Sequence, residues 1–186
     1  MWADVYKTGG SPTLNFLTKN GVPSYLTRCA TLTFPPYHGK REGVYCVDLY
    51  GDEVNEKVLK VYKDPIFASH DVPTLSLDEV NDDIIMNQYR NAYSLLMQYS
   101  KAELVITSRL HVTLPCLAFG TPVIYAGISS SLDDRVTVID GMGVKILNGR
   151  VLSCIPSLAL RKPSKVDVSA FRERYLKFLQ SCIRNQ

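Results

Sequence analysis

Long apolar runs, a signal peptide and clusters of basic residues are all missing from this 186-residue chain. No apolar run approaches the roughly 20 residues that a helix needs to span a bilayer, and residues 1–10 lack the apolar stretch of a signal peptide. The net charge is only +3, and isolated pairs such as Lys40-Arg41 are interpreted as solvated. The low net charge and the lack of basic clusters argue against a nucleic-acid-binding protein. We expect a cytoplasmic protein with no membrane span.

The five cysteines form no recognisable chemical motif. No two of them have the CxxC spacing of a zinc ribbon or redox pair, and most lie in apolar surroundings, so we interpret them as buried free thiols in a reducing compartment. We therefore expect no metal site. A nicotinamide or flavin dinucleotide is not expected either, because no Gly-x-Gly-x-x-Gly follows a strong strand. The cysteines are Cys29, Cys46, Cys116, Cys154 and Cys182.

Strand and helix patterns alternate through most of the chain, which is typical of a parallel sheet with helices on both faces. The hydrophobic content of 46% is sufficient for one well-cored domain. We expect an irregular segment over residues 1–12 and a Rossmann-like α/β domain over residues 13–186 that closes with a C-terminal helix. The predicted strands are 43–49, 65–70, 104–106, 123–125 and 144–147, and the clearest predicted helices are 52–61, 82–101, 110–118 and 168–183.

Two further elements are predicted from local patterns. Residues 29–34 indicate a strand or an extended loop. The helix over 82–101 is amphipathic, and its apolar residues at helical spacing predict the face turned toward the core. These residues are Ile85, Tyr89, Ala92, Leu96 and Tyr99.

A polar turn between a buried strand and a short helix carries the functional prediction. Ligands of open α/β sheets bind at the carboxyl ends of strands, and the N-terminus of a helix favours anions. Arg109 adds a fixed cation to this turn, and His111 adds an imidazole that can act as acid or base. Ser108, Arg109 and His111 therefore predict an anion-handling site.

These residues also have structural interpretations. Arg109 could pair with Glu103 or Asp134 instead of a ligand, and His111 could lie at the helix start without a catalytic role. Ser108 is more readily explained as the N-cap of the helix.

Three residues at other strand ends are candidates for the same pocket. His70 follows the strand over 65–70, and Arg135 follows the strand over 123–125; either could be a solvated or salt-bridged surface residue. Asp48, at the end of the strand over 43–49, could be a catalytic carboxylate, but a turn-capping role explains it more simply.

The run YSKAELVITSRLH (residues 99–111), with LPCLAFGTPVIY shortly after it, resembles the polysaccharide pyruvyl transferases. Members of that family end a strand in Thr-Ser/Asp-Arg-Leu/Ile-His before a short, Gly-Pro-interrupted helix. Weaker likenesses occur at residues 15–34, Val47-Asp48, His70 and Asp134-Arg135. The resemblance covers roughly residues 11–147.

The resemblance implies one half of a B-type glycosyltransferase fold. It also implies transfer of a pyruvyl group from phosphoenolpyruvate to a sugar of a polysaccharide or its precursor, giving a ketal and phosphate, without a further cofactor or metal. The catalytic residues that it implies are His111 and Arg109. The implied substrate-binding residues are Ser108, Arg109, Leu110, His70 and Arg135.

Two departures from the family pattern affect this expectation. Gly9-Gly10 stands where members often carry an Arg-Asp pair, and the chain is shorter than the roughly 300 residues of two such domains. The missing half could come from a partner domain or a homo-oligomer. Two alternatives therefore remain: the C-terminal domain of a nucleotide-sugar glycosyltransferase, and an inactive truncated member acting as a binding module.

Overall fold

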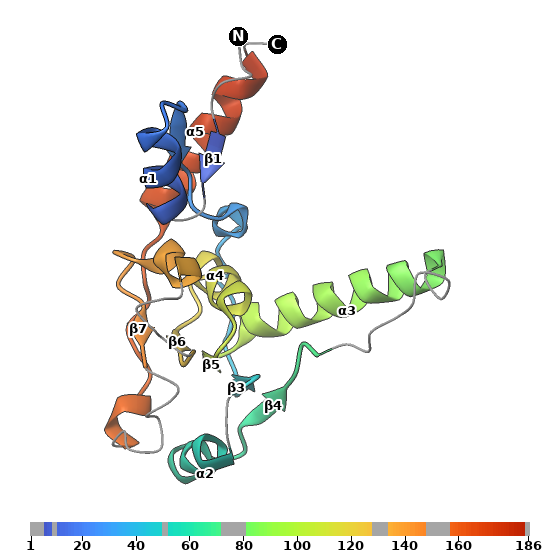
Figure 1. Cartoon of the computed structure of the whole chain (residues 1–186). Helices are drawn as coiled ribbons and strands as arrows, with labels where there is room; N and C mark the ends of the chain where they lie inside the picture. Colours follow the sequence, from blue (N-terminus) through green and yellow to red (C-terminus); the bar gives the residue numbers. More distant parts are fainter. Residues whose placement is uncertain are drawn as a thin grey trace.

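A five-stranded parallel sheet forms the centre of the structure, a computed structural model that describes residues 6–8, 11–49, 52–71, 81–127, 134–147 and 157–184 (Figure 1). The strand order is β4-β3-β5-β6-β7. The chain runs outward from β3 to β4 and then adds β5 on the other side of β3, so the order reverses between β3 and β5. The strands are β3 (Val44–Val47), β4 (Ile66–Ala68), β5 (Leu104–Thr107), β6 (Val123–Tyr125) and β7 (Lys145–Ile146).

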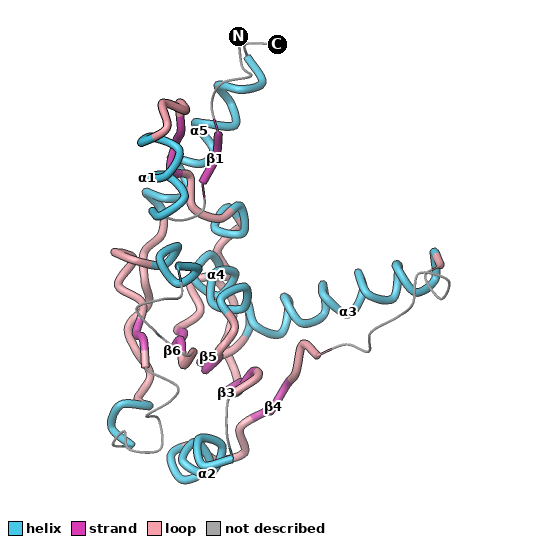
Figure 2. The backbone as a smooth tube through the Cα atoms, in the orientation of Figure 1, coloured by secondary structure: helices cyan, strands magenta, loops and turns pink. Residues whose placement is uncertain are grey.

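Helical elements cover both faces of this sheet (Figures 1 and 2). The helix α2 (Asp52–Val61) and the 3₁₀ helix η5 (Ser157–Leu160) contribute to the core on one face. The other face is covered by α3 (Asp82–Lys101), α4 (Leu110–Phe119), η1 (Ala30–Thr33), η3 (Asp134–Ile139) and α5 (Ser169–Arg184). The predicted α/β architecture, a parallel sheet with helices on both faces, is confirmed.

The central strands are apolar without alternation because both of their faces are buried. Val105 and Val123 belong to the core on the α4 side, whereas Ile106 and Ile124 belong to the core on the α2 side. Successive side chains of a strand point to opposite faces. A two-sided sheet therefore requires apolar residues at every position, as in buried parallel strands generally.

A smaller parallel sheet of two strands lies apart from the main one (Figure 2). It pairs β1 (Tyr6–Thr8) with β2 (Ser24–Leu26), and α1 (Ser11–Lys19) connects the two strands. The prediction of an irregular segment over residues 1–12 was therefore wrong for Tyr6–Thr8, because this short strand is defined by a partner 18 residues later in the chain.

Two local predictions were also wrong. Residues 30–33 form the 3₁₀ helix η1, which buries Leu32, instead of a strand. Helix α3 has the predicted bounds, but it projects from the sheet (Figure 1), so Ile85 and Tyr89 are exposed. The predicted inner face is buried only near the C-terminal end, at Tyr99, because the sheet is too small to reach the first turns of a helix of 20 residues.

Two arginines far apart in the sequence bind the C-terminal end of α4. The amino group Nη2 of Arg41 donates to the carbonyl of Phe119 (2.7 Å), and Nη2 of Arg172 donates to the carbonyl of Ala118 (2.9 Å). Gly120 ends the helix in the left-handed conformation (φ 69°), as its position predicted. Arg41 was therefore misinterpreted as solvated: it satisfies carbonyls that the helix leaves unpaired.

The structure also bears on the cysteines and on membrane crossing. Cys46 and Cys116 are buried free thiols, and burial raises the pKa of Cys46 to about 12 and also raises that of Cys116. Cys29 and Cys182 are only half-buried, and Cys154 lies outside the described residues. None of the helices in the described ranges has the length and apolarity needed to cross a bilayer.

Candidate functional site

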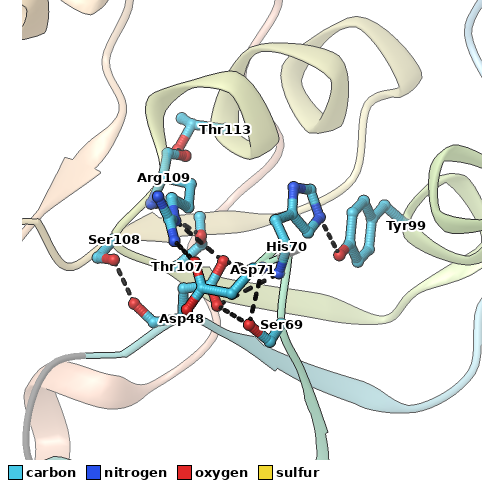
Figure 3. Close-up of polar contacts among 9 residues, drawn as sticks. All are labelled: Asp48, Ser69, His70, Asp71, Tyr99, Thr107, Ser108, Arg109 and Thr113. Carbon is cyan, nitrogen blue, oxygen red and sulfur yellow. Dashed lines mark hydrogen bonds and ion pairs between the residues drawn. The ribbon is translucent and has the colours of Figure 1, made fainter. Parts of the chain in front are cut away.

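The carboxyl ends of three neighbouring strands bring polar side chains together (Figure 3). Asp48 follows β3, residues 69–71 follow β4, and Ser108-Arg109 follows β5. The strand order reverses between β3 and β5, and this is the place where open α/β sheets bind their ligands. The geometry of the sheet therefore identifies this edge as the candidate site.

Asp48 links the three strand ends. Its Oδ1 accepts from Ser69 Oγ (2.7 Å), and its Oδ2 accepts from the backbone N–H of His70 (3.1 Å) and from Arg109 Nε (3.0 Å). Burial by itself would raise the pKa of Asp48, but these hydrogen bonds and the Arg109 charge together lower it. Asp48 has a left-handed backbone (φ 48°), which aspartate tolerates better than most residues. Asp48 therefore caps the turn after β4, as the simpler interpretation held, and it also anchors Arg109.

Arg109 is held between two carboxylates of different character. Its Nε bonds to Asp48, whose side chain is 9% exposed, and its Nη2 bonds to Oδ1 of Asp71 (2.6 Å), whose side chain is 81% exposed. Of the two alternative partners considered for Arg109, Glu103 pairs with Lys162 instead, and the side chain of Asp134 is outside the described part of the structure. Nη1 of Arg109 makes no hydrogen bond within the described part of the chain.

The start of α4 leaves backbone donors free. The N-cap of the helix is Arg109, and the predicted N-cap Ser108 instead donates its buried hydroxyl to the backbone carbonyl of Asp48. The amides of Val112 and Thr113 both bond to the Arg109 carbonyl. Among the described residues, no acceptor reaches the amides of Leu110 and His111. These two N–H groups are therefore available to an anionic ligand.

Tyr99 holds the His70 side chain in place beside the carboxylates of Asp48 and Asp71. The distance from His70 Nε2 to the Tyr99 hydroxyl is 2.7 Å, and the two rings are stacked with their centroids 5.8 Å apart (Figure 3). Burial lowers the pKa of His70, and the nearby Asp48 only partly opposes this effect. The imidazole is therefore held neutral near pH 7 and in one orientation.

His70 and His111 line the same groove. This groove has a volume of about 710 Å³ and lies between α3, the end of β4 and the first turns of α4. The side chain of His111 is exposed, whereas that of His70 is half-buried. Two of the predicted catalytic and binding residues thus face one cavity, with Asp71 at its edge linking it to Arg109.

The remaining predicted residues are less informative. Leu110 is half-buried and packs against the hydrophobic core. Arg135 lies in η3 after β6, but its side chain is outside the described part of the structure. Gly9-Gly10, where the family pattern expects an Arg-Asp pair, is also outside the described residues. Neither position adds to the site as it is described.

Asp71 and Tyr99 were missed as site residues by sequence reasoning. Asp71 directly follows His70 at a strand end, and that position was the available signal. Tyr99 appeared to be an ordinary core residue of an amphipathic helix. Its hydroxyl gives no local signal, because its partner His70 is 29 residues away in the chain.

The lowered pKa values predict how stability depends on pH. Below the ordinary histidine pKa of 6.5, the unfolded chain takes up a proton that folded His70 resists, so acidification favours unfolding. The contribution of His70 is fully present above pH 6.5 and is lost as the pH falls toward its folded pKa. Asp48 acts in the same direction below its ordinary value of 3.8.

Urea unfolding between pH 7.5 and pH 5 measures the histidine contribution. The free energy of unfolding of the wild type should fall over this range, and the fall should be smaller in His70→Asn. The control His38→Asn removes an exposed loop histidine and should follow the wild type. Parallel curves for the wild type and His70→Asn would contradict the lowered pKa.

A parallel α/β sheet with polar groups at the reversal of strand order defines a ligand-binding domain of Rossmann-like type. A sequence comparison then identifies its family: the polysaccharide pyruvyl transferase profile matches residues 10–130. The chain belongs to the polysaccharide pyruvyl transferase family. The match includes β3, β4, β5 and α4, and therefore every strand end of the site.

Two solved structures are similar in fold to this chain. One is described as the glycotransferase of kitacinnamycin, with a TM-score of 0.40, 15% identity, and coverage of 83% of this chain and 46% of that one. The other is the glycosyltransferase SnogD from Streptomyces nogalater, with a TM-score of 0.40, 16% identity, and coverage of 90% and 55%. The chain spans about half the length of these structures. No curated protein matches the sequence.

Proposed function

We propose that this chain supplies the donor side of a pyruvyl transfer from phosphoenolpyruvate to a sugar of a polysaccharide or its precursor. The observation that carries the proposal is the start of α4, where the free amides of Leu110 and His111 lie next to the anchored guanidinium of Arg109. Aligned N–H groups and an arginine are the groups that bind phosphate and carboxylate. Family membership supports this reaction class.

Asp71 acts as a placeholder for the donor in this proposal. The ion pair between Arg109 and Asp71 is largely exposed, and exposed pairs contribute only about 0–1 kcal/mol. A carboxylate or phosphate of the donor can therefore replace Asp71 on Nη2 at little cost. The part-buried bond from Nε to Asp48 meanwhile keeps the guanidinium in place.

The reaction needs proton transfers that His111 can provide. Ketal formation adds a proton to the methylene carbon of phosphoenolpyruvate, breaks the C–O bond to phosphate, and forms C–O bonds from two sugar hydroxyls to the central carbon. The hydroxyls release two protons, of which one balances the methylene carbon and the other the departing phosphate. His111 is proposed as the acid or base, because it is exposed in the groove and lies at the helix start.

His70 has a positioning role in this scheme. Its Nε2 is already bonded to Tyr99 and its ring is held neutral, so it orients a ligand group instead of exchanging protons freely. Since the chain spans about half of the similar structures, a partner domain or a second copy is proposed to close the site. The free thiols Cys46 and Cys116 fit a reducing, cytoplasmic location.

Donor binding tests the proposal through two substitutions with opposite effects. Arg109→Lys replaces the fork with a point charge that cannot keep both of its bonds, so it should weaken phosphoenolpyruvate binding at least tenfold. Asp71→Asn removes the competing carboxylate, so it should strengthen binding by about threefold to tenfold. Isothermal titration calorimetry with phosphoenolpyruvate at fixed ionic strength measures both effects.

His111→Gln separates binding from chemistry. It should leave the affinity for phosphoenolpyruvate within about threefold of the wild type, yet abolish phosphate release when acceptor is supplied. Binding of a nucleotide sugar instead of phosphoenolpyruvate would replace the proposal with the glycosyltransferase alternative. No binding of either donor to the wild type would leave only the role of a binding module.

A further inference from the structure

We infer that Tyr99 fixes His70 as the tautomer that carries its proton on Nδ1. Tyr99 is then a positioning residue: it makes His70 a hydrogen-bond donor toward the groove and prevents the ring from accepting a proton there. The assignment of the proton goes beyond the proposed function and does not depend on it. Only the use of this N–H by phosphoenolpyruvate rests on the proposed function.

The Tyr99 hydroxyl has to donate, because it has no other place for its proton. The residue is only 1% exposed, and its hydroxyl bonds to His70 Nε2 (2.7 Å) and to no other described residue. Burial raises the pKa of Tyr99, so the phenol keeps its proton at neutral pH. A proton on Nε2 would leave the phenolic O–H buried without an acceptor, which is costly. Nε2 is therefore the acceptor of this hydrogen bond.

His70 then has only Nδ1 left for its single proton. Burial lowers the pKa of the imidazole, so the ring is neutral near pH 7 and one of its two nitrogens carries a proton. Since Nε2 accepts from Tyr99, that nitrogen is Nδ1. It lies on the side of the ring away from the Tyr99 hydroxyl (Figure 3), and no described residue bonds to it. The free N–H belongs to a half-buried residue that lines the groove.

Both partners of this hydrogen bond are fixed by the fold. The backbone carbonyl of Tyr99 accepts from the buried hydroxyl of Thr121 (2.9 Å), and its ring meets Tyr45 edge to face with 6.0 Å between centroids. On the other side, the backbone N–H of His70 is bonded to Asp48 (3.1 Å). The hydrogen bond therefore joins two anchored residues and holds one tautomer.

The fixed tautomer gives the two histidines of the groove different roles. His70 presents an N–H and no lone pair, so it can stabilise an anionic oxygen but cannot accept a proton. His111 is exposed, and its ring makes no hydrogen bond within the described part of the chain, which leaves it as the proton acceptor of the site. If phosphoenolpyruvate is the ligand, the Nδ1–H of His70 adds one more N–H donor to those at the start of α4.

Proton–nitrogen correlation NMR of the imidazole rings at pH 7.5 reads the tautomer directly. The chain has only three histidines, so the spectrum of His70→Asn assigns the His70 signals by their absence. In the wild type, the nitrogen shift of His70 Nδ1 should be that of a protonated nitrogen, and the shift of Nε2 that of an unprotonated one. A wild-type His70 with its proton on Nε2 would overturn the inference without the need for any variant.

Tyr99→Phe tests whether the hydroxyl is the cause. It keeps the ring contacts, so the protein should fold, and the His70 shifts should move toward the Nε2–H form that free histidine prefers. The control Tyr45→Phe removes a hydroxyl from the ring that contacts Tyr99, and it should keep the wild-type shifts. Unchanged shifts in Tyr99→Phe would show that something other than this hydroxyl selects the tautomer.

Titration of the same proteins with phosphoenolpyruvate separates this inference from the proposed function. Loss of the Nδ1–H should weaken binding to Tyr99→Phe by about threefold to tenfold, whereas Tyr45→Phe should bind like the wild type. Equal affinities despite a shifted tautomer would reject the positioning role of Tyr99. A wild type with the Nδ1–H tautomer and no phosphoenolpyruvate binding would retain the tautomer and reject the proposed donor.

Discussion

Replacing Asp48 with alanine should lower the free energy of unfolding by about 3 kcal/mol. The substitution removes the charged acceptor shared by Ser69, the backbone N–H of His70 and Arg109 Nε. Hydrogen bonds to a charged group contribute about 1.5–3 kcal/mol each, and the exposure of Ser69 and Arg109 reduces their share. Alanine also tolerates the left-handed backbone (φ 48°) less well than aspartate does. Urea denaturation at pH 7.5 measures the change.

Two companion substitutions separate the carboxylate from the backbone. Asp48→Gly removes the same acceptor without the left-handed strain, so it should be about 1 kcal/mol more stable than Asp48→Ala. Asp64 has a similar backbone (φ 51°) in an exposed turn, and Asp64→Ala should cost only about 1 kcal/mol. Equal losses for Asp48→Ala and Asp64→Ala would mean that the hydrogen bonds of Asp48 add nothing to stability.

Arg41→Met should destabilise the protein by a similar amount, about 3 kcal/mol, although Arg41 lies outside the candidate site. Its guanidinium donates to the carbonyls of Phe119 (2.7 Å) and Tyr37 (3.2 Å), and also to Ser100 and Thr121. Methionine keeps the length of the side chain but removes all four of these hydrogen bonds, although the Phe119 carbonyl still accepts from the backbone N–H of Tyr37 (3.0 Å). Hydrogen bonds that involve a charged group contribute about 1.5–3 kcal/mol.

The adjacent Lys40 offers a matched control. It is exposed and pairs only with exposed Glu42 among the described residues, so Lys40→Met should leave the urea midpoint close to that of the wild type. Both variants lose one positive charge, and comparison of their urea midpoints therefore isolates the buried hydrogen bonds. A difference of less than 1 kcal/mol between them would show that the carbonyls at the end of α4 are satisfied in another way.

Much of the fold was predictable because the signals are local. The strand around Leu104–Thr107 is a continuous apolar run, and Gly120 terminates α4 as its position predicted. The buried face of α3 was not predictable, because periodicity identifies an apolar face but not whether another layer reaches it. The strand β1 was not predictable for a related reason: three residues are too few to show a periodic pattern.

The site was predictable where the sequence itself carries the chemistry. Arg109 and His111 are adjacent to a strand end and a helix start, and His70 ends another predicted strand. The partner of Arg109 was not predictable, because Asp48 is 61 residues away and becomes its neighbour only through the order β4-β3-β5. The same charge pattern with another strand order would have given another partner.

The bond from Arg172 to the carbonyl of Ala118 has a consequence for synthesis on the ribosome. Its two partners are 54 residues apart, and translation at roughly 5–20 residues per second separates their appearance by about 3–11 s. During that interval the end of α4 lacks one of the two arginines that hold it. The helix on which the donor position depends is therefore completed only when the last helix has emerged, so nascent chains without α5 should be early targets of chaperones and proteases.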